Sequence, residues 1–394
     1  MNGVELRSLM RWIAERFGRR RQLPPAGALD WLARPAYAAA AERSPAARAA
    51  AETIARHVST HRIIHVGPDG APAGGDLNAL FSGRPAPIYT APAWMYRLAY
   101  DLVLRGNAIA AVETDGARVR ALWPVDVNSV DIVRRGGDVF VRVTSPVSFV
   151  MPYDNVLHIT YRRSDDVVGS SLDAVLTDLL AAERDLIVAI GRSARLAAST
   201  RIVARLAGSL VSRKDMDAHR RYIADALSGG ANGTGVAILD ETVSDLTELR
   251  QSGVGIEAEL LRTVQASIIA AYGISPSIAT GSYTEEEYNS FYDSVVAPIV
   301  TAIASELETK LLTPRERALG HRIIIQSPPV AGTSLKTKLE IARLFSERGM
   351  MSINEARALF GLPPIDGGER VLQSLNFVDT KIAAAYQLSG GDTE

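Results

Sequence analysis

The sequence predicts an α+β protein, and two patterns lead to that prediction. Short apolar segments separated by tight turns, such as Asp115-Gly116 and Gly136-Gly137, predict an antiparallel meander between residues 108 and 161. Elsewhere the apolar positions recur at helical spacing. Because the helices and the strands occupy different stretches of the chain, an α+β fold is expected. The longest helices are predicted over 171–199, 257–272 and 284–312.

Composition sets the next limits. The chain has 394 residues, of which 47% are hydrophobic, so it can bury a sizeable core in two or three domains. It has no cysteine, which excludes disulfides and thiolate metal sites. The formal net charge of −1 is unlike that of a tight binder of DNA phosphates. No apolar run is long enough to span a bilayer, so no membrane partner is expected.

The amino-terminal half contains most of the predicted strands. Residues 1–21 have an amphipathic, arginine-rich pattern that fits an ordinary terminal helix or, alternatively, a membrane-surface helix. Residues 22–44 are rich in Ala, Pro and Arg and are interpreted as a linker, and 67–92 as a loop. Helices are predicted over 45–57 and 94–104, and strands over 61–66, 108–113, 118–123, 129–133, 139–144 and 156–161.

The stretch from 268 to 312 organises the carboxy-terminal half. Gly273 and Pro276 end one helix and open a loop of small residues. Thr284 and Glu287 form a capping box at the start of the next helix, and Pro298 is expected to kink that helix. This helix carries more acidic than basic side chains, so it would repel phosphates if it faced DNA: Glu285, Glu286, Glu287, Asp293, Glu306 and Glu308 against Lys310.

The remaining segments are a compact insert and a helical end module. Within the insert, 201–250, a helix is predicted near 213–228 and a strand over 236–239. A strand over 321–326 is expected to return to the first sheet. The end module contains helices over 335–348 and 353–360, and Ser352 and Glu355 cap the second of them.

No pattern of catalytic or metal-binding residues emerges. His57, His61 and His65 are spaced by four, but a change from helix to strand falls between them. Residues 229–235 resemble a phosphate-binding loop in their glycines, yet no Lys-Ser/Thr follows and the order of elements is wrong. The sequence lacks a nucleophile elbow. The isolated histidines His158, His219 and His321 are interpreted as structural. We therefore expect no enzyme, metal or cofactor.

Five stretches resemble the portal proteins of tailed bacteriophages when they are taken in order. They are LRGNAIAAVE (104–113), LWPVDVNSV (122–130), DNVLHITYRRSDDVVGSSLDAV (154–175), AAYGISPSIATG (270–281) and GMMSINEARALFGLPPIDGGE (349–369). The order of these stretches, rather than any one motif, carries the resemblance, which covers roughly residues 45–378. The short, Ala/Arg-rich chain is also similar to the portals of alphaproteobacterial gene transfer agents.

The resemblance implies a ring of about twelve subunits at one capsid vertex of a virion or phage-like particle that is assembled in the bacterial cytoplasm. The implied partners are the major capsid protein, the large terminase, a head-completion or tail adaptor protein, and the double-stranded DNA that enters and leaves through the channel. The implied parts are an N-terminal tail or linker (1–44), a wing (45–170 with 318–332), stem helices (171–199 and 257–272), a clip (200–256), a tunnel loop (273–283), a kinked tunnel helix and exit (284–317) and a crown with a C-terminal tail (333–394).

The resemblance also implies which residues face DNA and partners. The tunnel loop and helix start would place Ser277, Thr280, Ser282, Glu285 and Glu286 at the channel. Four arginines at the stem and clip end form either a weak positive ring or ion pairs with neighbouring subunits: Arg192, Arg195, Arg201 and Arg205. Terminase and adaptor would dock on the clip at Arg213, Lys214, Asp217, Arg220, Asp240 and Glu241. The tunnel loop contains no basic residue, so the sequence gives it no firm grip on DNA.

Two other functions are weighed against this one. Residues 335–360 could be a helix-turn-helix of a DNA-binding regulator, but the supposed recognition helix offers only Arg357 as a cation for base contacts. A hydrolase that uses a lone histidine such as His158 is the other alternative, and turnover lost in His158→Ala would support it.

Overall fold

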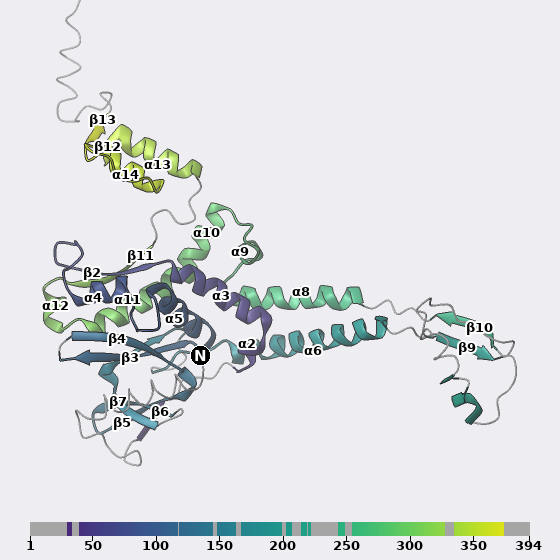
Figure 1. Cartoon of the computed structure of the whole chain (residues 1–394). Coiled ribbons are helices and arrows are strands. Elements are labelled where there is room, and N and C mark those ends of the chain that lie inside the picture. The colour runs from purple at the N-terminus through teal and green to yellow at the C-terminus, as the bar shows by residue number, and fades with distance from the viewer. Residues whose placement is uncertain are drawn as a thin grey trace, which may run out of the picture. The chain divides into compact units, whose positions relative to one another are not determined.

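The computed structural model describes residues 30–33, 39–116, 118–144, 148–162, 167–198, 202–206, 214–218, 220–221, 243–248, 254–327 and 335–373. Figure 1 shows the helices and strands with their labels. The chain divides into two compact units, one formed by Asp178–Gln265 and the other by Met1–Thr177 with Ala266–Glu394. Residues 1–21, with the amphipathic terminal pattern, lie outside the described residues.

A three-stranded antiparallel sheet forms the centre of the larger unit. Its order is β4-β3-β8, with β3 (Asn107–Asp115) between β4 (Arg118–Val125) and β8 (Val156–Thr160). Helix α5 (Ala91–Arg105) packs on this sheet, and the Trp94 indole N–H donates to the carbonyl of Leu122 over 2.9 Å. Trp94 is fully buried, so this bond satisfies a polar atom that has no access to water.

Helix α3 (Pro45–Ser59) packs closely against α5. The buried face of α3 is largely alanine, including Ala47, Ala51 and Ala55, so the two backbones can approach each other. Ser44 caps the helix by accepting from the backbone N–H of Ala47 at 3.1 Å. The predicted start of this helix is therefore confirmed.

The predicted meander is split between two sheets, which corrects the expectation of one. Strands β5 (Val130–Arg135), β6 (Asp138–Thr144) and β7 (Ser148–Pro152) belong to a second sheet of order β1-β5-β6-β7. A 3₁₀ turn at Val127–Ser129 separates β4 from β5, and the Asp126 side chain caps it. This short turn changes the direction of the chain. Its Asp-Val-Asn-Ser sequence includes ordinary turn formers, but they were not recognised as a turn between two stretches with a strand pattern.

The first edge strand of that sheet lies in the stretch predicted to be a linker. Strand β1 (Asp30–Ala33) pairs antiparallel with β5, and α2 (Ala39–Arg43) follows it. The Asp173 carboxylate accepts from the backbone N–H groups of Ala40 and Ala41 at the start of α2. Helix α2 is short and rich in alanine, so its sequence shows no helical periodicity of apolar residues by which it could be recognised.

A third pairing joins distant parts of the chain. Strand β2 (Arg62–Val66) pairs with β11 (Arg322–Gln326) in a separate two-stranded sheet. Helix α4 (Asp76–Ser82) lies within the predicted loop 67–92 and packs beside β2. Its Asn78 side chain accepts from the backbone N–H of His65 and donates to its carbonyl, both over 2.8 Å. Glycines and prolines flank α4 instead of filling it, which is why composition alone missed this helix.

The smaller unit contains most of two long helices. Helix α6 (Asp173–Ala198) and helix α8 (Val254–Ala271) run side by side in opposite directions (Figure 1). The Gln265 amide donates to the Glu183 carboxylate over 3.1 Å, and Glu183 is only 1% exposed. Strands β9 (Ile202–Leu206) and β10 (Val243–Glu248) pair antiparallel. Of the predicted helix 213–228, residues 214–218 are described as helical, and the predicted strand 236–239 is outside the described residues.

The end module follows the predicted order of helices and adds two strands. It contains α13 (Leu335–Glu347), β12 (Arg348–Ser352), α14 (Ile353–Leu359) and β13 (Val371–Gln373), and β12 pairs with β13. A strand therefore stands between the two helices, so this module is not a helix-turn-helix. Among the described residues, no helix has both the length and the apolar character needed to cross a bilayer.

Two glycines allow two backbone segments of the larger unit to approach closely, where the start of β3 meets the residues after β8. Asn107 binds the backbone of Gly169 from both sides: its amide donates to the Gly169 carbonyl over 2.7 Å, and its side-chain oxygen accepts from the Gly169 N–H over 2.9 Å. A Cβ on Gly169 would lie 1.9 Å from the Gly106 carbonyl oxygen. The backbones approach so closely that only glycine fits.

We expect Gly169→Ala to lower the free energy of unfolding by at least about 2 kcal/mol, because the added methyl group meets backbone that cannot rotate away. Gly137→Ala is the matched control, since a Cβ there meets nothing within 4 Å. The control should change stability by less than about 0.5 kcal/mol. Chemical denaturation of both variants measures the difference, and equal midpoints would show that the close approach is absent.

Candidate functional site

Five of the nine residues predicted for a channel, Ser277, Thr280, Ser282, Glu285 and Glu286, lie in one continuous segment, 273–296, which we call the channel segment. Its first part, predicted to be a loop, contains a short helix, α9 (Pro276–Thr280). The Ser275 hydroxyl accepts from the Ile278 N–H, and Gly281 ends the helix in the left-handed region with φ 74°. One helical turn is too short for a periodic pattern, but Ser-Pro before it and Gly after it are cap signals.

Glu287 connects α9 to the next helix, α10 (Glu285–Phe291). Its carboxylate accepts from the backbone N–H of Thr284 over 2.8 Å and from the Ser277 hydroxyl over 2.9 Å. The Glu287 N–H donates in return to the Thr284 hydroxyl, which completes the predicted capping box. The backbone bond from Thr284, followed by the Ser277 bond, holds the pKa of Glu287 below its usual range.

The charge of the channel segment is entirely negative. It contains Glu285, Glu286, Glu287 and Asp293 and no Lys, Arg or His. Thr280, Ser282 and Glu286 are exposed, while Ser277 and Glu285 are partly buried. The segment therefore presents hydroxyl and carboxylate groups to solvent.

Aromatic side chains fix the other face of α10 to the end of α3. Tyr288 and Phe291 are buried, and their rings lie 5.5 Å and 5.3 Å from the His57 ring. The next turn places Tyr292 on His61, with ring centroids 5.7 Å apart and nearly parallel planes. This contact holds the channel segment against the larger unit.

The His61 ring has a defined hydrogen-bonding role. Its Nδ1 lies 3.1 Å from the carbonyl oxygens of both His57 and Val58, so Nδ1 carries the proton and donates. The other nitrogen, Nε2, accepts from the Tyr292 hydroxyl over 2.9 Å. Burial lowers the pKa of His61, which favours this neutral form.

A π-helical turn at Tyr292–Val296 lies between α10 and α11 (Ala297–Leu311). The Ala297 N–H donates to the carbonyl of Tyr292, five residues back. Pro298 follows within the first turn of α11, where its missing N–H costs least. The sequence indicated an irregularity near Pro298, and the structure puts the π turn just before it. A bend produced by Pro298 itself stays a prediction.

Helix α11 is bound to strands of the larger unit by its charged side chains. The Glu306 carboxylate accepts from the backbone N–H of His158 over 3.0 Å, and Glu308 accepts from that of Ile323 over 3.1 Å. The Lys310 ammonium donates to the Tyr153 carbonyl over 2.9 Å and lies 4.0 Å from the centre of that ring. Glu306 and Glu308 therefore bind backbone groups of β8 and β11.

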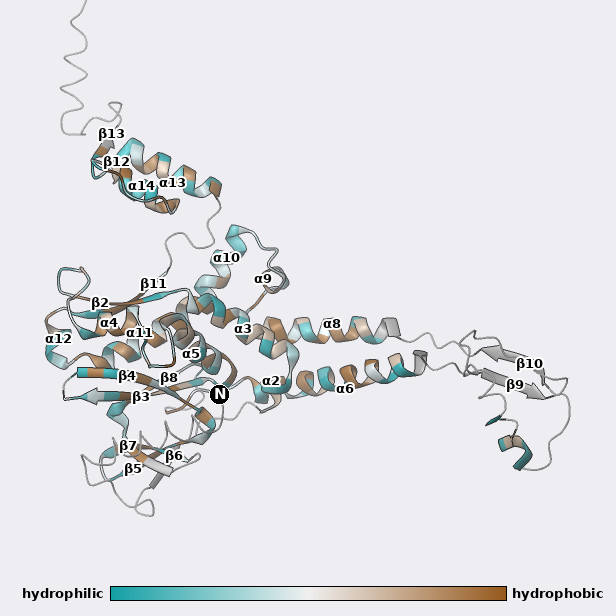
Figure 2. Ribbon diagram, in the orientation of Figure 1, coloured by the Kyte–Doolittle hydropathy of each residue, from teal (hydrophilic) through white to brown (hydrophobic). Residues whose placement is uncertain are grey.

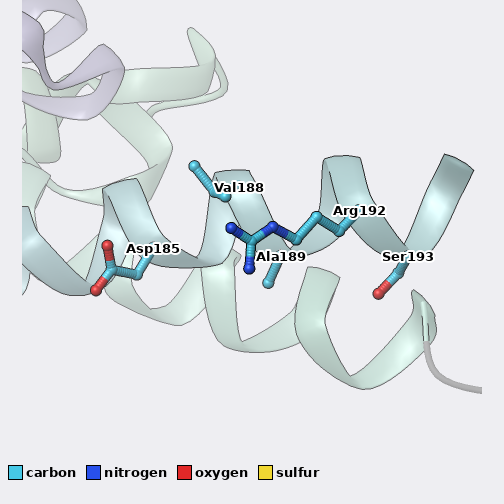
Figure 3. A pocket seen from close by; sticks show the side chains of 5 residues that line it. All are labelled: Asp185, Val188, Ala189, Arg192 and Ser193. Carbon is cyan, nitrogen blue, oxygen red and sulfur yellow. The ribbon is translucent and has the colours of Figure 1, made fainter.

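Two of the four predicted arginines lie on α6. Figure 3 shows Arg192 on the same helix face as Asp185, Val188, Ala189 and Ser193, around a cavity of about 330 Å³. Arg192 and Arg195 are both exposed. Arg205 lies in β9, and Arg201 is outside the described residues. The structure thus brings Arg192 and Arg195 onto the same end of one helix.

The predicted docking residues are described only in part. Lys214, Asp217 and Arg220 are exposed, and the Arg220 guanidinium lies 3.7 Å from the Asp217 carboxylate. Arg213, Asp240 and Glu241 are outside the described residues.

The histidines of the described chain have structural partners. His65 Nε2 lies 3.0 Å from His321 Nδ1, and His158 lies between the Asn107 and Tyr153 side chains at 3.0 Å and 2.9 Å. Within the described ranges, no group of three or more His, Cys, Asp or Glu side chains is arranged to hold a metal ion. His219 lies outside these ranges.

Stability should fall as the pH decreases from about 7.5 to about 5.5. Burial lowers the pKa of His57, His61 and His65 in the folded chain, below the 6.5 of a free imidazole. The unfolded chain then binds more protons in this window, so stability is fully present above the unfolded pKa and is lost as the pH falls. His61→Gln should flatten the dependence. Urea midpoints that do not decrease with pH would contradict this account.

Comparison with known proteins gives the family. The model of a family described as phage portal protein matches residues 45–361. Two curated relatives, called probable portal proteins of Lactococcus phages p2 and SK1, are 22% identical over 190 residues, or 45% of this chain and 50% of each relative. The chain thus spans about half the length of these curated relatives.

Solved structures of gene transfer agent (GTA) particles share the fold. The neck of an empty particle, computed with C6 symmetry, is 18% identical, with a TM-score of 0.61 over 82% of this chain and 91% of that one. The neck of a native particle, computed with C12 symmetry, is 17% identical, with a TM-score of 0.59 over 90% and 99%. With a family model that matches most of its length, the chain belongs to the phage portal protein family.

Proposed function

We propose that copies of this chain close into a ring at one vertex of a virion or phage-like particle, and that double-stranded DNA enters and leaves through the ring. The observation that carries the proposal is the match of the portal family model to residues 45–361. The C12 symmetry of the similar GTA neck supports a ring of about twelve copies. The role that we propose for the ring is structural.

We propose that each subunit of the ring has the parts that the resemblance to portal proteins implies. Residues 45–170 with 318–332 form the wing, 171–199 and 257–272 form the stem, and 200–256 form the clip. The channel segment 273–296 and α11 form the tunnel loop and helix, and 333–394 form the crown and tail. The pairing of β2 with β11 supports the assignment of 318–332 to the wing, because it places this late strand beside an early one.

The channel segment suits a conduit because it does not bind its cargo. Each cation that neutralises a DNA phosphate adds affinity, and a ring multiplies every side chain by the number of subunits. A segment with four carboxylates and no cation repels the duplex and leaves it free to slide. Ser277, Thr280 and Ser282 would offer only neutral hydroxyl contacts, with Glu285 and Glu286 at the helix start.

The partners of the ring are the major capsid protein, the large terminase during packaging, and a head-completion or tail adaptor protein afterwards. We assign terminase and adaptor docking to the clip. The exposed charged side chains of Lys214, Asp217 and Arg220 support this assignment, since rim charges set the rate and choice of association.

The mass of the purified particle, combined with end-on electron micrographs, tests the ring. We expect closed rings of about twelve subunits with a central opening of at least about 20 Å, the width of a DNA duplex. A monodisperse species that binds one specific short duplex with a steep dependence on salt would overturn the proposal in favour of a DNA-binding regulator.

Reversal of charge at Arg192 and Arg195 tests whether they line the channel. If they guide DNA, Arg192→Glu with Arg195→Glu should reduce the DNA protected per particle severalfold, because the new carboxylates repel phosphates. Arg315→Glu, at an exposed arginine of α12 (Pro314–Ala318), is the control. Normal packaging by rings of reduced stability would instead place the two arginines in contacts between subunits.

A further inference from the structure

The end module 335–373, which we call the crown module, has no hydrophobic core of its own. None of its apolar side chains is among the buried residues of the described chain, and Ser352 is its one buried side chain there. Its exposed large apolar residues are Leu335, Leu339, Leu344, Met350, Leu362, Ile365 and Val371. Figure 2 shows hydrophobic residues along the ribbon of this module. A module of fewer than about 40 residues usually needs disulfides, a metal or a partner to be stable.

Polar contacts hold the module's turns instead. Asn354 accepts from the Ile365 N–H over 2.9 Å and donates to the Ile365 carbonyl and the Glu369 carboxylate over 3.2 Å and 2.8 Å. Ser352 and Glu355 form a capping box at the start of α14. Such exposed hydrogen bonds contribute only about 1 kcal/mol each, because water competes for both partners. These hydrogen bonds fix the conformation of the turns, but they do not bury the apolar surface of the module.

The exposed leucines of α13 lie on two opposite flanks of the helix. Leu335 and Leu339 are four residues apart, so they share one flank, and they are 67% and 55% exposed. Leu344, which is 44% exposed, lies about 140° around the axis from Leu339 at about 100° per residue. Between the flanks, Ile341 and Phe345 are partly buried on the face that packs on β12, β13 and α14.

The two apolar flanks match the two different patches that each subunit of a closed ring uses. A two-fold dimer uses one self-complementary patch, and docking on one other surface also uses one patch, whereas a closed ring uses two different patches on opposite sides. The charges of the module do not oppose the approach of a second copy, because its cations and anions are nearly balanced: Lys336, Lys338, Arg343, Arg348, Arg357 and Arg370 against Glu340, Glu347, Glu355, Asp366 and Glu369. A nucleic acid would require an excess of cations.

We propose that the crown module becomes stable only when the ring closes, because the Leu335/Leu339 flank of one copy packs against the Leu344 flank of the next copy. This inference rests on the proposed ring. Beyond the ring itself, we infer that neighbouring subunits stabilise the folded crown module. The contact between crown modules is head-to-tail.

Hydrogen exchange on the full-length chain tests the dependence on neighbours. In unassembled chain, the amides of α13 should exchange at least about tenfold faster than in rings, while those of α3 and α5 should exchange slowly in both states. Strong protection of α13 in the unassembled chain would overturn the inference, because the module would then be stable by itself. That result would leave the ring itself intact as a proposal.

Pairs of introduced cysteines test the head-to-tail contact. Because the sequence has no native cysteine, any disulfide must join introduced residues. We expect two double variants to give a ladder of disulfide-linked oligomers when assembled rings are oxidised. One combines Leu339→Cys with Leu344→Cys, and the other combines Leu335→Cys with Leu344→Cys. The two positions of one helix are too far apart to join within a copy. Each single variant should give no dimer. Dimers from a single variant, or no ladder from either pair in rings of confirmed mass, would overturn the contact.

Discussion

The position of the channel segment depends on how the helix that follows it is fixed to the wing. Glu306 and Glu308 accept from the backbone of β8 and β11, and Lys310 donates to the carbonyl of Tyr153. Each bond pairs a charged side chain with a backbone group of β8, β11 or the 3₁₀ turn Tyr153–Asn155, and hydrogen bonds to charged groups are stronger than those between neutral ones. The opposite end of the helical segment is held by the His61 and Tyr292 contact. The channel segment is therefore anchored to the larger unit at its carboxy-terminal end, through Tyr292 and through the helix that follows.

This attachment divides the acidic residues of the long helix into two sets with different tasks. Those of the last turns face strands and stabilise the fold. Of those at its beginning, Glu286, Glu287 and Asp293 are exposed, while Glu285 is partly buried and accepts from the Thr337 hydroxyl; together they set the charge that we propose for the channel. A conduit needs both properties, because its wall must be rigid and must not bind phosphate. The π turn at Tyr292–Val296 lies between the two sets.

Local signals predicted the elements well, and contacts between distant residues were not predictable. Thr284 and Ser352 were identified as caps because the residues of a capping box lie within four positions of one another, and both cap their helices in the structure. The partners of Glu306 and Lys310 are 148 and 157 residues away, so a single sequence holds no signal for them. The division into two sheets was missed because the 3₁₀ turn at Val127–Ser129 does not interrupt the succession of short apolar segments that predicted one meander. Portal membership came from the order of motifs, and the family comparison confirms it.

A reconstruction of the assembled ring that resolves side chains at its narrowest point is the most direct test of the account. The account predicts that residues from Ser277 to Glu286 line this constriction and present hydroxyl and carboxylate groups. It also predicts that Glu306 and Glu308 stay bound to β8 and β11, away from the opening. A constriction lined by basic side chains, or by residues of the wing sheets, would contradict the claim that the channel segment forms a wall that DNA slides past.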